Sequence, residues 1–398
     1  MTLLSIAGGN LDMMISSDYT EISSFVSPDH GFTVFTTQIP KVWSAADHQC
    51  ILWCNQLVKV LADAMFKIQD PKASTRTKPR AERMRILRNI FQSGIIDRKI
   101  TLMPVATSFD TPPGPSISSL RLTESDSSTT FTITPEPNSD IFVFLTDCRI
   151  GIQYTLRACS KNECIDLEDS VLQIPSSKTG VEFFEHLKLD KKDAKWKSFG
   201  LDSIVLTTRG AWSSGFWSGQ WTRDNVQIIS ATYMDMIIRG GKFNVSIKSL
   251  VSTILFSKIK TSLLKYRLRI TRPSTAEVLF APVLHHSIST SSEEKFWSSL
   301  SSEVELNFFG LESPYTHQLV KSRELTGFIL RLFVDPAEEI ITIEMEADLY
   351  GSMGHLVRTY KMVLLAFPFV VVLLVVKEQL DRWNRLGMLI FWGIAIKS

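Results

Sequence analysis

The segment TTQIPKVWSAADHQCILWCNQL, residues 36–57, decides how the first part of the chain folds. It continues a run, FTVFTTQI at residues 32–39, whose branched and aromatic residues predict a strand. Residues 40–47 predict a loop, and residues from Gln49 onward predict a helix that begins with a capping pair of Ser44 and Asp47. His48 is therefore expected on a loop that follows a strand. The apolar residues expected on the sheet-facing side of the helix recur at helical intervals: Ile51, Leu52, Leu57, Val58, Leu61, Ala64 and Met65.

A second strand is expected just upstream, at residues 2–7 (TLLSIA). It ends at Gly8-Gly9-Asn10-Leu11-Asp12, a glycine turn that delivers a carboxylate. An acid and then a histidine, each on a loop after a strand, follow the order of the last two catalytic groups of an α/β-hydrolase. Asp12 and His48 are the candidate catalytic residues. An ordinary glycine turn and an ordinary Asp-His helix start remain open as alternatives.

The two blocks SIAGGNLD (residues 5–12) and TTQIPKVWSAADHQCILWCNQL resemble the GPI inositol-deacylase family, endoplasmic-reticulum lipases with an α/β-hydrolase domain. The resemblance implies that Asp12 is the acid and His48 the base of a catalytic triad. His48 would take the proton of a serine hydroxyl while Asp12 holds the imidazole. The implied substrate is the acyl ester on the inositol of GPI-anchored proteins, and no cofactor is expected.

The nucleophile of such a triad is not found before Asp12, because no Gly-x-Ser-x-Gly motif precedes it. The nearest similar sequence, Tyr350-Gly-Ser-Met-Gly354, lacks the first glycine and predicts a loop. We therefore expect a fragment, either an incomplete gene model or a truncated isoform, that is inactive alone. No signal peptide is visible at the start, so we expect the targeting segment to have been lost with the nucleophile.

The expected fold is α/β, a partial α/β-hydrolase sheet, followed by a mainly-β region and a C-terminal transmembrane helix. Short β-rich runs separated by turn residues predict a sandwich, which the resembled family suggests is jelly-roll-like. The expected domains are 1–70, the C-terminal part of the lipase domain; 71–99, a basic helical connector; 100–355, the sandwich region; 356–378, the transmembrane helix; and 386–398, a truncated second hydrophobic segment.

Three segments admit two interpretations each. The basic, apolar-striped run at residues 71–99 suits either a helix on anionic lipid or a solvated connecting helix, and we favour the connector. The residues Trp212, Trp217 and Trp221 suit either a glycan-stacking platform or sandwich packing, and we favour packing. Residues 107–130, rich in Ser, Thr and Pro, predict a loop or linker. His285-His286 is expected in a turn with no acid or cysteine at ligand spacing, so we predict no metal site.

Five cysteines do not pair evenly. Cys50 and Cys54 lie four apart on the predicted helix, which disfavours a bridge between them. Cys148, Cys159 and Cys164 fall in the first β region, where Cys159 with Cys164 could close a small loop in an oxidising compartment, and the pairing among the five cysteines stays open. Asn244-Val-Ser246 is an N-glycosylation sequon whose use depends on exposure in the lumen.

A net charge of +2 on 398 residues gives no support to nucleic-acid binding. The uncharged run MVLLAFPFVVVLLVV at residues 362–376, extended by Tyr360 and flanking lysines, predicts a helix in the lipid bilayer. A buried core helix is its alternative. The expected location is the endoplasmic reticulum membrane, with the bulk of the chain lumenal. A different class of function stays open: a non-catalytic, membrane-tethered β-sandwich protein that binds glycolipid or a protein partner.

Overall fold

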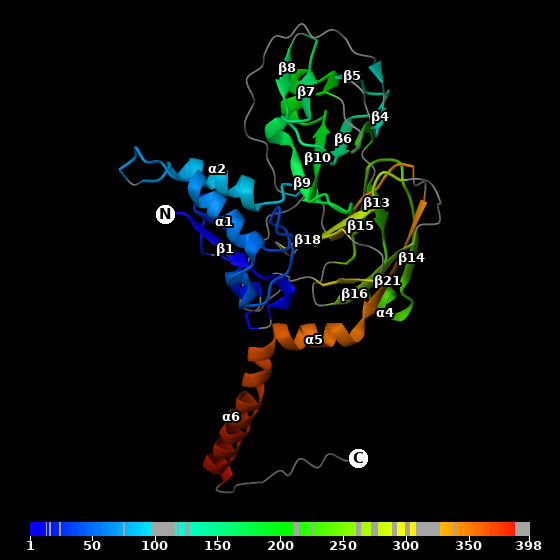
Figure 1. Cartoon of the computed structure of the whole chain (residues 1–398). Helices are drawn as coiled ribbons and strands as arrows, with labels where there is room; N and C mark the ends of the chain where they lie inside the picture. The colour runs from blue at the N-terminus through cyan, green and yellow to red at the C-terminus, as the bar shows by residue number, and fades with distance from the viewer. Residues whose placement is uncertain are drawn as a thin grey trace.

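The computed structural model describes residues 1–12, 14–15, 17–23, 25–74, 76–96, 116–117, 119–123, 128–161, 163–210, 215–223, 226–259, 264–271, 278–288, 293–298, 303–307, 327–337 and 340–386. These residues form an α/β part, two β-sandwiches and two C-terminal helices (Figure 1). The second hydrophobic segment expected at residues 386–398 lies almost wholly outside the described residues.

The α/β part begins with two parallel strands, as the sequence predicts, although the second ends at Phe35 and not at Ile39, because residues 36–39 form turns. Strand β1 (Leu3–Ala7) pairs in register with β2 (Gly31–Phe35). Helices α1 (Asn55–Lys67) and α2 (Arg80–Phe91) cover this small sheet, and α2 places its buried apolar residues against α1 and β2. The arginine-rich helix therefore packs its apolar side into the protein. Short 3₁₀ helices lie at η1 (Gly9–Leu11), η2 (Ser17–Thr20) and η3 (Cys50–Leu52).

Helix α1 begins six residues later than the sequence predicts. Gln49 does not start it, because the backbone forms η3 first and then turns extended at Cys54, with φ −59° and ψ 108°. Asp47 caps this preceding turn, and Ser44 takes no part in the cap. The buried face of α1 is accordingly narrower than expected: Leu57, Val60 and Ala64 are buried, whereas Leu52, Val58 and Met65 are exposed.

The first sandwich holds two five-stranded sheets, with strand orders β4-β12-β6-β10-β9 and β3-β5-β11-β7-β8. Its elements are β3 (Ser116–Ile117), β4 (Ser119–Leu122), β5 (Thr130–Ile133), β6 (Ile141–Thr146), β7 (Tyr154–Cys159), β8 (Cys164–Asp166), η4 (Glu168–Ser170), β9 (Leu172–Pro175), β10 (Phe183–Asp190), α3 (Ala194–Phe199), β11 (Ser203–Thr208) and β12 (Trp217–Thr222). Side chains of both sheets meet in one apolar core that includes Phe144, Tyr154 and Trp217.

The second sandwich pairs a five-stranded sheet, β13-β15-β20-β17-β18, with a four-stranded one, β14-β21-β16-β19. Its elements are β13 (Val226–Ile229), α4 (Tyr233–Ile238), β14 (Gly241–Ser246), β15 (Val251–Phe256), β16 (Lys265–Thr271), β17 (Val283–Ile288), β18 (Glu294–Trp297), β19 (Val304–Leu306), β20 (Phe328–Phe333) and β21 (Ile340–Asp348). A separate apolar core lies between these two sheets.

The two sandwiches also pack on each other. A third cluster joins β6, β9 and β10 of the first sandwich to β17, β18 and β20 of the second. Strand β6 is therefore buried at every position, facing its own core on one side and the neighbouring sandwich on the other. This double burial explains the continuous apolar run in β6, where an exposed sheet would show alternation.

Several sequence predictions for the β region need correction. His285 and His286 do not lie in a turn but in the middle of β17, fully buried. Residues 107–130 are not one loop, because β3 and β4 lie within them and join opposite sheets. Trp217 and Trp221 are buried in β12, as the packing interpretation predicts, while Trp212 lies outside the described residues.

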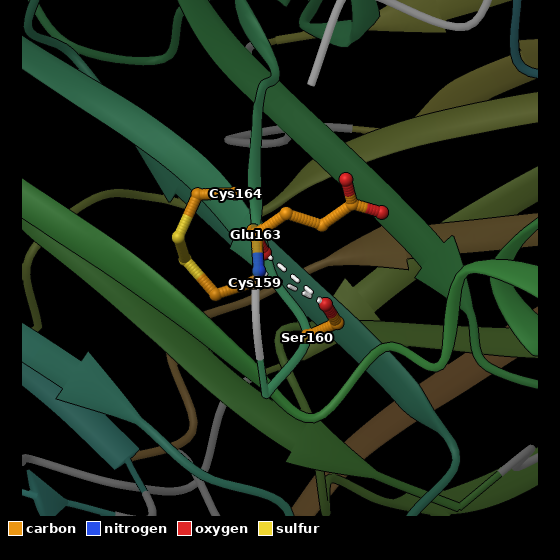
Figure 2. Close-up of a disulfide and its surroundings, with 4 residues drawn as sticks. All are labelled: Cys159, Ser160, Glu163 and Cys164. Atoms are coloured by element: carbon orange, nitrogen blue, oxygen red, sulfur yellow. Dashed lines mark hydrogen bonds between the residues drawn. A yellow bond between two sulfur atoms is a disulfide. The ribbon is translucent and has the colours of Figure 1, made fainter. Parts of the chain in front are cut away.

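The predicted pairing of Cys159 with Cys164 is confirmed by a disulfide that joins the ends of β7 and β8. Figure 2 shows the bond beside the tight turn it closes, in which Ser160 and Glu163 exchange hydrogen bonds. Cys50, Cys54 and Cys148 are free thiols, and Cys148 is buried.

The chain ends in two helices, α5 (Leu349–Thr359) and α6 (Lys361–Leu386). Tyr350-Gly-Ser-Met-Gly354 therefore lies in a helix and not in a loop. Figure 1 shows α5 lying beneath the second sandwich and α6 leading away from the folded body. By length and composition α6 is a candidate membrane span, at residues 361–385, and none of its apolar window is buried within the protein. Within the described residues, this exposure gives no support to the alternative of a buried core helix.

Candidate functional site

The two sequence-predicted catalytic residues, Asp12 and His48, lie together in the structure. His48 Nδ1 is 3.0 Å from Asp12 Oδ2, although the residues are 36 positions apart. The side chain of Asp12 is 10% exposed and that of His48 is 41% exposed. The pair thus joins a largely buried carboxylate to an imidazole that reaches solvent.

Close backbone packing next to the glycine turn brings the two residues together. The parallel pairing of β1 and β2 continues past the strands, where Thr36 N donates to Ala7 O at 2.9 Å. Ala46 N then donates to Gly8 O at 2.9 Å, two residues before His48. A Cβ on Gly8 would overlap with the carbonyl oxygen of Ala46, so this approach requires glycine.

The turn after β1 fixes the Asp12 carboxylate. Gly9 has a φ of +82°, which favours glycine, and Asp12 N donates to Gly9 O to close η1. Asp12 Oδ1 accepts hydrogen bonds from the backbone N–H groups of Met14 and Ile15, at 3.0 and 2.8 Å. Burial alone would raise the pKa of Asp12, but the hydrogen bonds from Ile15, His48 and Met14 outweigh it and leave this pKa below its usual value.

An ionised Asp12 dictates the tautomer of His48. Because the carboxylate only accepts hydrogen bonds, His48 must carry its proton on Nδ1 and donate it to Asp12 Oδ2. Nε2 then bears the lone pair, and within the part of the chain that the structure describes it has no hydrogen-bond partner. A half-exposed, oriented imidazole with a free Nε2 is the arrangement of a general base.

The second sandwich also contacts the turns beside this pair. Thr37 Oγ1 donates to the backbone oxygen of Glu294 at 2.8 Å, and Glu294 N donates to Gln38 Oε1 at 3.4 Å. A Cβ on Gly9 would come within 3.2 Å of Glu293 Oε1. Glu293, which precedes β18, and Glu294, the first residue of that strand, therefore lie against these turns. Sequence reasoning missed these contacts, because they join residues more than 250 positions apart.

The Glu294 side chain belongs to a buried polar network. Its Oε2 accepts from Ser93 Oγ at 2.6 Å and from His285 Nε2 at 2.9 Å, and Arg331 Nη1 lies 3.4 Å from His285 Nδ1. Burial lowers the pKa of His285, and hydrogen bonds from His285 and Ser93 lower the pKa of Glu294 despite its burial. A neutral His285 that donates to an ionised Glu294 satisfies every one of these contacts. The network fastens the α/β part to the second sandwich.

A third contact ties the site to the C-terminal helices. Lys361 Nζ, at the first residue of α6, donates to Met14 O at 2.9 Å. Met14 follows Asp12 in the same turn and also donates its N–H to the Asp12 carboxylate. The first residue of the candidate membrane helix is therefore hydrogen-bonded directly to the loop that holds Asp12. Among the described residues, no group of three or more His, Cys, Asp or Glu is placed to hold a metal ion.

The sequence of the chain is similar to known proteins. Residues 1–68 match the family described as the PGAP1-like alpha/beta domain. The whole chain aligns with a GPI inositol-deacylase of Aspergillus oryzae at 30% identity, covering 37% of that protein. GPI inositol-deacylases of Chaetomium globosum and Aspergillus fumigatus match at 29% and 28% identity over 98% and 100% of the chain, each covered to 39%.

The chain thus spans less than half the length of the curated relatives it matches. Among solved structures, the stem and receptor binding domain of the spike protein P1 from bacteriophage PM2 aligns with 60% of this chain and 99% of its own. Its sequence identity is 8% and its TM-score 0.10, so it carries no argument about fold.

Proposed function

Because this chain belongs to the GPI inositol-deacylase family, we propose that it supplies the acid and the base of an ester-hydrolysing site that acts on GPI-anchored proteins. The observation that carries the proposal is the hydrogen bond between His48 Nδ1 and Asp12 Oδ2. The two bonded residues lie in the α/β segment that matches the family. They correspond to the acid and the base of a Ser-His-Asp site, which orient and deprotonate the nucleophile.

In the proposed reaction, His48 Nε2 accepts the proton of a serine hydroxyl as that oxygen attacks the acyl carbonyl on the inositol. Asp12 remains ionised, keeps the imidazole in its Nδ1–H tautomer and stabilises the imidazolium that forms. His48 then returns the proton to the departing inositol oxygen. Water, deprotonated by the same Nε2, releases the fatty acid in the second step.

We propose that the serine comes from a part of the longer relatives that this chain does not span. We therefore propose that β1 and β2 are two strands of a larger α/β-hydrolase sheet, and that residues 1–398 alone release no fatty acid. The first sandwich supports the jelly-roll-like proposal as well, since its strands β4, β5, β6 and β7 alternate between the two sheets.

Two features of the described residues support the proposed compartment. The disulfide between Cys159 and Cys164 is of a kind that persists in oxidising compartments such as the endoplasmic-reticulum lumen. The exposed apolar surface of α6 suits a lipid environment. We propose an endoplasmic-reticulum membrane location with the α/β part and both sandwiches on the lumenal side.

The test uses the longer protein that contains this chain, assayed for fatty acid released from an inositol-acylated GPI. Asp12→Asn removes the negative charge that selects the tautomer and should lower kcat by roughly 10⁴-fold. His48→Ala should lower it at least as much. Asp63→Asn, an exposed carboxylate on α1 whose partner is Lys67, is the matched control and should leave kcat unchanged.

Two outcomes would overturn the proposal. Full activity of the His48→Ala protein would remove the general base and favour a binding role for the chain. Fatty-acid release by purified residues 1–398 in detergent, above a heat-killed control, would show that the nucleophile lies within the chain.

A further inference from the structure

Helix α5 exposes apolar side chains and turns polar ones toward the protein, the reverse of a surface helix in a soluble protein. Within residues 349–357, the part of this helix whose exposure the structure describes, the exposed residues are all apolar, aromatic or glycine: Leu349, Tyr350, Met353, Gly354, Leu356 and Val357. At 100° per residue these six occupy one continuous arc of the helix. Tyr350 is 93% exposed and Met353 62% exposed. A solvated surface helix would present charged and polar side chains on this arc.

The opposite side of α5 faces the protein and is polar. Ser352 is buried, accepts a hydrogen bond from Lys265 N at 2.8 Å, and donates to Asp348 O at 2.6 Å. Asp348 caps the helix by accepting from Gly351 N at 3.0 Å. A Cβ on Gly351 would crowd Lys265 and Asp348, so α5 sits close against β16 and β21. The helix is therefore fixed with its apolar arc turned outward.

The continuity of α5 with α6 indicates what covers this arc. Tyr360 is the single residue between the two helices, and Leu364 N donates to Tyr360 O at the join. The exposed apolar surface thus runs from α5 directly into the candidate membrane span. In Figure 1, α5 lies across the base of the second sandwich where α6 departs. An amphipathic helix in that position lies in the plane of the bilayer interface, where tyrosine and lysine are favoured.

The loop that carries the catalytic acid borders the same surface. Lys361 Nζ donates to Met14 O, and Leu11, Met14 and Ile15 are exposed apolar residues on either side of Asp12. A lysine at the start of a membrane helix holds its ammonium group at headgroup level. Its hydrogen bond to Met14 therefore sets the depth of this loop relative to the lipid.

We propose that the outward arc of α5, together with Leu11, Met14 and Ile15, is a bilayer-binding surface that seats the folded body on the membrane with Asp12 and His48 at the interface. The lipid surface itself is the partner. One step rests on the proposed function. It is that a membrane-anchored acyl ester reaches His48 without leaving the interface.

The experiment measures the depth of single nitroxide labels on residues 1–398 in nanodiscs of zwitterionic and anionic phosphatidyl lipids. Cys50→Ser and Cys54→Ser remove the accessible thiols, while Cys148 is buried. Labels are placed at Met353→Cys on α5 and at Ile228→Cys on β13, a control that is 64% exposed and lies on another element of the second sandwich. Collisions with oxygen report lipid, and collisions with a water-soluble nickel chelate report solvent.

We expect the label at 353 to collide more with oxygen than with nickel and the label at 228 to show the reverse. A label at 353 as open to nickel as the one at 228 would overturn the proposal. So would a label at 353 closed to both agents, which would indicate a protein contact in place of lipid. A further label, Val371→Cys in α6, distinguishes failure of the bilayer-binding surface from failure of the proposed membrane location.

If the label at 371 is in lipid and the label at 353 is in water, only the bilayer-binding surface fails. If both labels are in water, the membrane part of the proposed function fails with it. Neither reading depends on turnover, so inactivity of the chain leaves the test intact.

Discussion

Acidification should destabilise the packing of the two sandwiches through His186. This residue lies in β10 and is 4% exposed. Its Nδ1 donates to Phe144 O at 3.0 Å, and its ring lies edge-on to Phe333 of the second sandwich, with centroids 5.0 Å apart. Burial lowers the pKa of His186 to about 4, although the hydrogen bond to Phe144 opposes the shift. The folded protein therefore keeps this imidazole neutral at pH values where the unfolded chain protonates it.

The sign and size of the effect follow from that difference. An unfolded histidine has a pKa of about 6.5. Between pH values of about 6.5 and 4 the unfolded chain therefore binds more protons than the folded protein, and the free energy of unfolding decreases as the pH is lowered. At pH 5 the loss from this one group is about 2 kcal/mol relative to pH 7.5. Burial lowers the pKa of His285 and His286 as well, so these residues act in the same direction.

The variant His186→Asn isolates the contribution of His186 to the pH dependence of unfolding, because the Asn amide nitrogen takes the place of the imidazole Nδ1 as donor and does not titrate. Free energies of unfolding would be measured by guanidinium titration in detergent at pH 7.5 and pH 5, with tryptophan fluorescence as the signal. The parent should lose about 2 kcal/mol more than the variant between the two pH values. Equal losses in the two proteins would refute the assignment of a buried, neutral His186.

Three further outcomes are expected. Thr37→Val removes the donor to Glu294 O and should cost about 1 to 2 kcal/mol; differential scanning calorimetry checks this, and an unchanged melting temperature would contradict it. Expression through a eukaryotic secretory pathway should add a glycan to the exposed Asn244, seen as an endoglycosidase-sensitive mobility shift that Ser246→Ala abolishes; a parent without the shift would contradict both glycan and lumenal side. Phe91→Ala should cost about 3 to 5 kcal/mol, because that side chain is fully buried against α1; a loss below about 1 kcal/mol by chemical denaturation would contradict this packing.

Local sequence predicted Asp12 and His48 each on a loop after a strand, but it left an ordinary glycine turn and an ordinary helix start open, and the resemblance to the family implied their pairing. Parallel strands place such loops at one edge of a sheet, and the structure brings the two side chains together there. The loop closed by Cys159 and Cys164 could be named as a candidate because the two cysteines are close in sequence and flank a turn, although spacing left the pairing among the five cysteines open. Local sequence therefore identified candidates wherever the partners lie within one or two adjacent elements.

Prediction failed where distant residues override local preference. The dipeptide His285-His286 after Pro282 suggests a turn, yet both side chains are buried in β17, and Glu294 on the paired strand provides the hydrogen bond that makes burial of His285 tolerable. Gly351 and Gly354 likewise argue against a helix. Helix α5 forms nonetheless, because Asp348 caps it and its packing on β16 and β21 needs a residue without a side chain at 351.

The same distinction bears on how the site is held. The bond between His48 and Asp12 is set up within the first 50 residues, but the turn that carries Asp12 is contacted from three directions. Ala46 approaches Gly8 from the histidine loop, Glu293 lies close to Gly9 from the residue before β18, and Lys361 donates to the carbonyl oxygen of Met14 from α6. An oriented carboxylate contributes to catalysis only while its geometry is kept within a fraction of an ångström. The sandwiches and the candidate membrane span are therefore part of what supports the candidate site, and the geometry of the Asp12–His48 pair depends on contacts that local sequence does not predict.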